Sequence, residues 1–192
     1  MSSIDATVAI LDALESCGIE YMLVGAFSSN AYGIARATHD ADFVVVLRQG
    51  QLRALADRLG PEFSLDPQMQ MEGFTGSIRN VITHRPTEFR IELFRLNSSD
   101  EHHKERFRRR QRQPLQELKR DVWIPAVEDV IIQKLRWQRR KDLDDVVGVL
   151  TVSGPIIDWT YVRTWSVAHG TDTLLQELLR EVPDLPESEP KT

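Results

Sequence analysis

The sequence predicts an α+β fold, in which a mixed β-sheet with flanking helices is followed by a C-terminal helical region. Two observations favour the sheet. Short apolar runs that end at turn residues recur in the first half of the chain, and two such runs are separated by a turn-like segment. A third observation favours the helical end, because apolar residues from Ala126 onward recur at helical spacing.

The first elements alternate between helix and strand. Residues 5–17 place apolar side chains close to helical spacing, and a glycine ends that helix. Residues 21–24 (YMLV) are a continuous apolar run, typical of a buried strand that closes at a glycine. Residues 27–34 can form a short helix with a serine as its cap, and residues 41–47 (ADFVVVL) are β-branched and apolar. We therefore expect two strands that flank one helical crossover.

The middle of the chain adds a helix and a hairpin. Residues 51–59 carry an apolar stripe at helical spacing that ends at a Gly-Pro pair. Residues 77–83 and 88–96 alternate or run apolar on either side of the loop HRPT at residues 84–87. These two segments are expected to pair as antiparallel strands of the same sheet.

The C-terminal part is expected to be helical. Apolar residues at helical spacing continue through residues 126–150, and Gly154-Pro155 then stops the pattern. Residues 158–169 and 171–179 predict two further helices.

Length and composition indicate a soluble globular protein, since the 192 residues are 41% hydrophobic and 28% charged. We expect a core over residues 1–125, a helical region over residues 126–182 packed on that core, and a disordered tail over residues 183–192. No segment is apolar enough to span a membrane, and the N-terminal segment lacks the basic residues of a signal peptide. The single cysteine, Cys17, excludes an internal disulfide framework, and the cytoplasm is the expected compartment.

Charge is unevenly distributed along the chain. The net charge of −5 argues against general nucleic-acid binding, yet six of the 24 basic residues lie in the segment KERFRRRQR, residues 104–112. Such a run is usually a solvated helix face or loop. It can also be a contact for a polyanion such as RNA, and the sequence leaves both interpretations open.

Two D-x-D pairs occur, Asp40/Asp42 and Asp142/Asp144, but a chain with 15 aspartates in 192 residues should contain about 1.2 such pairs by chance. Their setting separates them. Because side chains alternate across a strand, Asp40 and Asp42 point the same way at the start of the FVVVL strand. In a helix Asp142 and Asp144 diverge, whereas Asp142 and Asp145 share a face.

The pair Asp40/Asp42 is a candidate metal site. Two neighbouring carboxylates repel each other, and a cation that neutralises them removes this cost. Oxygen ligands favour Mg²⁺, which also accepts substrate phosphates. The alternative is that both acids end a strand in solvent. Glu92, flanked by apolar residues in RIELF, adds a third carboxylate if its strand lies beside the first, as two-metal phosphoryl transfer requires, and is otherwise a solvent-facing strand residue.

Two stretches resemble the DNA polymerase β-like nucleotidyltransferase superfamily. In YMLVGAFSSNAYGIARATHDADFVVV a glycine turn after a strand precedes D-x-D on the next strand, which is the signature of that family. The R-x-T-x-D-x-D form of small bacterial nucleotidyltransferases, and of AbiEii-type toxins, is matched by Arg36, Thr38, Asp40 and Asp42. The later stretch PAVEDVIIQKLRWQRRKDLDDV is similar to the downstream segment of the same group.

The resemblance implies a role for each matched residue. Asp40, Asp42 and Glu92 would hold Mg²⁺ or Mn²⁺ and would be catalytic together with Lys134, which would reach the triphosphate. The nucleotide-binding residues implied are Gly25, Ala26, Ser28, Arg36, Thr38, Lys134, Asp142 and Asp145. The alternative for Lys134 and Asp142 is that they are helix-surface residues with favourable helix-dipole or ion-pair contacts.

Two positions depart from the family pattern. The family has Gly-Gly or Gly-Ser at the turn, whereas this chain has Gly25-Ala26, so a hydroxyl for the phosphates must come from Ser28 or Ser29. The third acid is more often an aspartate than a glutamate such as Glu92.

The implied activity is transfer of a nucleoside monophosphate from an NTP, ATP among them, to an acceptor that is RNA, protein or a small molecule, with loss of pyrophosphate. The alternative is a catalytically weak toxin–antitoxin component with a protein partner encoded nearby, or an RNA-binding module that uses residues 104–112. A drug-modifying enzyme is a third candidate. Trp137, Trp159 and Trp165 lie in predicted helices and are expected to pack rather than stack on bases.

Overall fold

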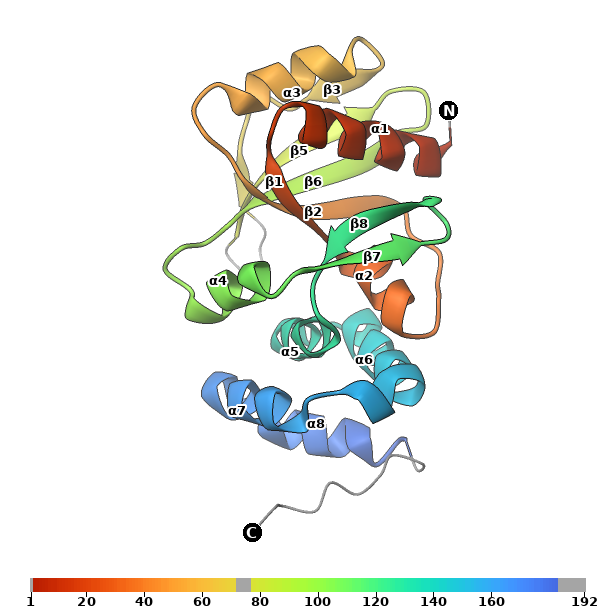
Figure 1. Ribbon diagram of the computed structural model, residues 1–192, viewed down its shortest axis with the longest axis vertical. Helices are drawn as coiled ribbons and strands as arrows, with labels where there is room; N and C mark the ends of the chain where they lie inside the picture. Colours follow the sequence, from red (N-terminus) through yellow and green to blue (C-terminus); the bar gives the residue numbers. More distant parts are fainter. Residues whose placement is uncertain (1, 72–76, 183–192) are drawn as a thin grey trace. The chain divides into compact units, whose positions relative to one another are not determined.

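The computed structural model describes residues 2–71 and 77–182. These residues form two compact units (Figure 1). The first unit comprises Met1–Phe27 and Ala37–Ile124, and the second comprises Ser28–Arg36 and Pro125–Thr192.

A mixed six-stranded sheet forms the centre of the first unit. Its strands are β1 (Glu20–Val24), β2 (Asp40–Val46), β3 (Phe63–Leu65), β4 (Gln70–Met71), β5 (Ile78–His84) and β6 (Phe89–Arg95). The order is β1-β2-β6-β5-β3, and β4 pairs with β5. Strands β2 and β6 run parallel, whereas the other neighbours run antiparallel.

One face of this sheet is apolar and carries two helices, α1 (Ser3–Ser16) and α3 (Gln51–Leu59) (Figure 1). Alternate residues of β1, β2 and β6 point to this face and are buried: Tyr21, Leu23, Ala41, Phe43, Val45, Ile91 and Leu93. Helix α1 begins with a capping box, in which Ser2 Oγ accepts from the Asp5 amide and the Asp5 carboxylate accepts from the Ser2 amide. The residues between these buried ones point to the opposite face.

A helix and a second, two-stranded sheet complete the first unit. Helix α4 covers Glu101–Arg108, and β7 (Gln111–Leu115) pairs antiparallel with β8 (Arg120–Ile124), which packs beside β1. Phe107 of α4 is buried with Met22, Val24 and Val44 on the second face of the large sheet. The basic segment 104–112 therefore belongs to α4 and the start of β7.

The second unit is helical. Its helices are α5 (Val127–Trp137), α6 (Arg140–Ser153), α7 (Trp159–His169) and α8 (Asp172–Leu179), with a 3₁₀ turn at Gly154–Ile156. Helix α5 packs on α6 and α7, and α8 packs on the same two helices. Their core is apolar and includes the fully buried Ile131, Leu135 and Leu150.

Residues 28–36, which include most of helix α2 (Gly25–Tyr32), belong to this helical unit. The Tyr32 hydroxyl donates to the carbonyl of Pro125 at 2.9 Å, and Ser153 Oγ donates to the carbonyl of Tyr32 at 2.6 Å. Gly33 lies so close to the backbone of α6 that a Cβ at this position would be 2.8 Å from the amide nitrogen of Val149. Contacts with α6 therefore hold this segment to the unit.

The α+β class and the mixed sheet predicted from the sequence are confirmed. The expected helix at residues 27–34 starts two residues earlier, directly after β1, so its serines lie inside the helix and not at its cap. Strands β1 and β2, expected to flank a crossover, are antiparallel. The short strands β3 and β4, helix α4 and the β7–β8 hairpin were not anticipated.

The domain division at residues 125/126 stays a prediction, and the expected disordered tail, residues 183–192, lies outside the described residues. Among the helices of the described residues, none has the length and apolar character needed to cross a membrane.

Candidate functional site

The parallel pairing of β2 with β6 places the three predicted carboxylates on two adjacent strands. In this register Asp40 lies opposite Arg90 and Asp42 lies opposite Glu92. Cross-strand partners point to the same face, so the side chains of Asp40, Asp42 and Glu92 share the second face of the sheet. The Glu92 strand therefore lies beside the Asp40/Asp42 strand, which is the condition under which the three carboxylates could share a site.

Asp42 is packed against the start of helix α2. Strand β1 ends at Val24, the cross-strand partner of Asp42, and the chain enters α2 at Gly25 with φ of 66°. A Cβ at Gly25 would lie 2.3 Å from Oδ2 of Asp42. Only glycine gives the backbone both this conformation and this close approach to the carboxylate.

Asp40 is oriented by a neighbouring hydroxyl. Thr38 Oγ1 donates a hydrogen bond to Oδ1 of Asp40 at 2.8 Å. Asp40 and Asp42 are both partly exposed.

Arginines engage both carboxylate oxygens of Glu92. Arg79 Nη1 lies 2.5 Å from Oε2 of Glu92, and Arg90 Nη2 lies 3.1 Å from Oε1. Within residues 2–71 and 77–182, no three His, Cys, Asp or Glu side chains are grouped so that they could hold a metal ion. Glu92 as a third metal ligand therefore stays a prediction.

Sequence reasoning missed the two arginines beside Glu92. Arg90 precedes Glu92 by two positions in the same strand, so strand alternation could have placed both on one face. Arg79 could not be found this way, because it reaches Glu92 from strand β5.

A second group of predicted residues meets inside the helical unit, around Lys134. Lys134 Nζ lies 3.0 Å from Oδ1 of Asp142 and 2.6 Å from Oδ2 of Asp145. Arg36 makes a two-pronged contact with Asp145 at 2.7 and 3.0 Å, and Arg139 contacts Asp142 at 2.5 Å. Two carboxylates and three cations thus form one ion network between α5, α6 and the segment before β2.

The network is buried, with Lys134 3% exposed and Asp142 fully buried. Burial alone would raise the pKa of Asp145, but the hydrogen bond from Arg36 and the charge of Lys134 outweigh it and lower that pKa. Lys134 and Asp142 form an ion pair, but the expected place on a helix surface is wrong, because both are buried between α5 and α6. Both Asp142 and Asp145 contact Lys134, as expected of residues on one helix face. Contact of Lys134 with a triphosphate stays a prediction.

The remaining candidates for nucleotide binding lie on or beside α2. Ala26 follows Gly25 in the first unit and is buried, and Ser28 and Ser29 are each 2% exposed in the second unit. Arg36 exchanges backbone hydrogen bonds with the side chain of Asn30 at 2.9 and 3.0 Å. The nucleotide-binding roles of these residues stay predictions.

The basic segment 104–112 is largely paired within its own unit. Lys104 contacts Glu101 at 2.7 Å and Arg108 contacts Glu105 at 2.7 Å. Arg110 pairs with Glu20 at 3.0 Å, and its guanidinium lies 4.1 Å from the ring centroid of Phe107.

Two of the three tryptophans that were expected to pack do so. Trp159 and Trp165 pack against the apolar core of the helical unit, and Trp165 also stacks on His169 with ring centroids 5.5 Å apart. Trp137 lies beside two cations of the ion network, with its ring centroid 4.9 Å from the Arg139 guanidinium and 5.8 Å from Lys134 Nζ.

No protein-family model matches the chain, and no curated protein matches it. Solved structures, in contrast, do match the chain. The antibiotic-resistance factor ANT(2'')-Ia in solution superposes with a TM-score of 0.58 at 14% identity, covering 94% of this chain and 99% of the other. ANT(2'')-Ia in complex with adenylyl-2''-tobramycin gives 0.60 at 13% identity, with 90% and 99% covered.

An antigenic nucleotidyltransferase-like protein from Paracoccidioides brasiliensis gives a TM-score of 0.55 at 17% identity, covering 91% of each chain. At these identities the likeness concerns the fold alone. The chain therefore has a nucleotidyltransferase-like fold, and the closer grouping with AbiEii-type toxins stays a prediction.

Proposed function

We propose that this chain is a metal-dependent nucleotidyltransferase that moves a nucleoside monophosphate from an NTP to an acceptor. One observation carries the proposal. In a nucleotidyltransferase-like fold, the Asp40/Asp42 pair points to one face of β2, and the backbone of Gly25 lies against Asp42. One similar structure is a complex with adenylyl-2''-tobramycin, which is a nucleotidylated compound, so ATP is the first nucleotide to test.

The donor set fits a divalent cation of the magnesium type. Asp40 and Asp42 are two residues apart in a strand, about 7 Å between Cα atoms, with carboxylates on one side. Carboxylate oxygens are the ligands that Mg²⁺ and Mn²⁺ prefer. In our proposal these aspartates would hold the cation, and Glu92 would join them when Arg79 turns from Glu92 to a substrate phosphate. The bound cation would neutralise charge on the phosphates and lower the pKa of the acceptor hydroxyl.

The protein's own part is to position the reactants. Thr38 holds Asp40, and Gly25 lets Asp42 approach the start of α2. The N-terminus of a helix favours a phosphate group. The acceptor oxygen attacks the α-phosphorus, the bond from that phosphorus to the bridging oxygen breaks, and pyrophosphate leaves. The proton of the acceptor passes to a neighbouring carboxylate or to water.

Pyrophosphate release tests this proposal. The purified protein is incubated with each of the four NTPs and Mg²⁺ or Mn²⁺, in the presence of mixed RNA, protein and small-molecule acceptors. We expect release with at least one NTP, and a loss of at least about 100-fold in Asp42→Asn. Asp57→Asn is the matched control, since Asp57 is a 73% exposed aspartate on α3 of the same unit.

Binding is measured separately by thermal unfolding. An NTP with Mg²⁺ at about 100 times its Kd should raise the melting temperature by about 5–10 °C, and Asp42→Asn should reduce that shift. If none of the four NTPs shifts the melting temperature and none yields pyrophosphate, the proposal is wrong.

A further inference from the structure

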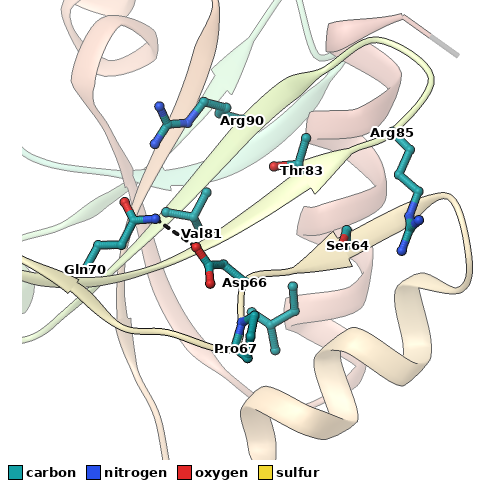
Figure 2. Close-up of a pocket in the computed structure, with 9 residues that line it drawn as sticks. Ser64, Asp66, Pro67, Gln70, Val81, Thr83, Arg85 and Arg90 are labelled. Carbon is teal, nitrogen blue, oxygen red and sulfur yellow. Dashed lines mark hydrogen bonds between the residues drawn. The ribbon is translucent and has the colours of Figure 1, made fainter.

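A groove of about 620 Å³ lies on the face of the sheet that carries the aspartate pair. Figure 2 shows the residues that line it, which come from β3 to β6, the turn after β3 and the turn between β5 and β6. The polar ones are Ser64, Asp66, Gln70, Thr83, Arg85 and Arg90. All of them belong to the first unit.

A row of cross-strand partners connects this groove with the candidate metal site. Ser64 on β3 is opposite Thr83 on β5, Thr83 is opposite Arg90 on β6, and Arg90 is opposite Asp40 on β2. Partners in register share a face, so the four side chains form one polar row across the sheet. With strands about 5 Å apart, the row extends about 15 Å from the aspartate pair into the groove.

The groove offers more positive charge than negative charge to a ligand. The Arg90 side chain is 49% exposed, and its Nη2 lies 3.1 Å from Oε1 of Glu92. A guanidinium carries five N–H donors, more than this one contact uses. Arg85 is exposed and adds a second guanidinium.

The groove lining also contains an acid, Asp66, and both oxygens of its carboxylate accept hydrogen bonds from neighbouring residues. One oxygen accepts from the side chain of Gln70 at 2.9 Å (Figure 2). The other accepts from the backbone amide of Gln68, also at 2.9 Å. Hydrogen bonds from Gln68 and Gln70 lower the pKa of Asp66, so these contacts involve the ionised carboxylate.

We propose that this groove binds the acceptor of the nucleotidyl transfer, and that the acceptor is a small molecule with a hydroxyl group and a phosphate or carboxylate group. The inference rests on the proposed function and deepens it. The acceptor hydroxyl lies at Asp40 and Asp42, and its anionic group lies in the groove, about one to three strand spacings away, or about 5–15 Å. Arg90 and Arg85 attract that group from opposite ends of the groove (Figure 2). The hydroxyls of Thr83 and Ser64 complete the contacts to the anion.

The nucleotidyl transfer to this acceptor needs no reactant besides the NTP and the acceptor. The acceptor hydroxyl oxygen forms a bond to the α-phosphorus of the NTP, the bond to the bridging oxygen breaks, and pyrophosphate leaves with that oxygen. The hydroxyl proton passes to a neighbouring carboxylate or to water. The same groove disfavours a polycation such as tobramycin, because two arginines would repel its ammonium groups.

The groove is tested without nucleotide, by NMR titration of the ¹⁵N-labelled full chain with inorganic phosphate, acetate or tobramycin. We expect phosphate or acetate to shift the amide signals of Thr83 and Arg85 with a millimolar Kd, and the stronger of the two identifies the anion. Tobramycin should leave these signals in place. Arg85→Gln and Arg90→Gln should each weaken anion binding at least about fivefold.

The matched control is Arg53→Gln, which removes an 89% exposed arginine on α3 of the same unit and should leave the Kd unchanged. The inference is overturned if neither anion shifts the groove signals, if the two groove variants bind like the wild type, or if tobramycin is the ligand that shifts them. These outcomes are independent of the NTP experiments, so an NTP-dependent thermal shift combined with a silent groove rejects the acceptor site alone.

Discussion

The contact between the Gly25 backbone and the Asp42 carboxylate is the tightest restraint on any single residue of the candidate site. Gly25 has positive φ, and the space where a Cβ would lie is occupied by Oδ2 of Asp42, 2.3 Å away. An L-residue there needs both a strained backbone and a displaced carboxylate. The glycine is therefore tied to the position of Asp42 as well as to the turn.

Replacing Gly25 with alanine tests this restraint. Gly25→Ala should lower the free energy of unfolding by clearly more than the ~1 kcal/mol cost of placing alanine at positive φ, and should abolish pyrophosphate release. Urea unfolding and the pyrophosphate assay measure the two effects. Gly18→Ala is the matched control, since Gly18 has φ of 59° and a Cβ added there would meet no atom within 4 Å. Equal losses in the two variants would show that the approach to Asp42 does not matter.

Among the secondary-structure elements, helices α5 and α6 are joined by the ion network around Lys134. Removal of one member of a buried ion pair leaves an uncompensated charge, which costs about 3–5 kcal/mol. Lys134 keeps Asp142 when Asp145 is lost, whereas Arg36 loses its two-pronged partner. The network therefore also fixes the segment that leads into β2.

We predict that Asp145→Asn lowers the free energy of unfolding at neutral pH by about 3 kcal/mol, measured by urea unfolding. The pKa of Asp145 is lower in the folded chain than its ordinary value of 3.8. Its contribution is therefore fully present above about pH 5 and is lost as the pH falls below 3.8. The difference between variant and wild type should shrink over that acidic range.

Asp144→Asn is the control on the same helix, because Asp144 is exposed whereas Asp145 is buried. It should change the free energy of unfolding by no more than about 0.5 kcal/mol. If Asp145→Asn has the same free energy of unfolding as the wild type, the ion network does not stabilise the fold as proposed. The same conclusion follows if the difference in free energy of unfolding between the two grows on acidification.

Over the whole molecule, a net charge of −5 and the internal pairing of the basic segment 104–112 disfavour RNA as a partner. Cations that are already paired release fewer counterions on binding a polyanion. We predict that the protein purifies free of RNA, as judged by the ratio of absorbance at 260 and 280 nm. RNA that copurifies, is released by salt and is lost in Arg112→Gln would support the RNA-binding alternative.

Much of the fold could be predicted from the sequence because its longer elements carry their own patterns. Helix α3 begins and ends where its apolar stripe and the Gly-Pro pair place it, and the strands β5 and β6 pair as an antiparallel hairpin. Strand β3 has three residues and β4 has two, too few to show alternation. The polar β7 was hidden for another reason, since its residues continue the charge run of α4.

The sequence by itself determined that Asp40 and Asp42 point the same way, because strand alternation depends only on local backbone geometry. Only the tertiary structure decided what lies beside them, since strand order and register arise from packing between distant segments. In that register Glu92 lies opposite Asp42 and forms ion pairs with Arg79 and Arg90. The same register forms the polar row from Asp40 to the groove. The helical unit likewise buried Lys134 between two aspartates that local spacing could only place on one face.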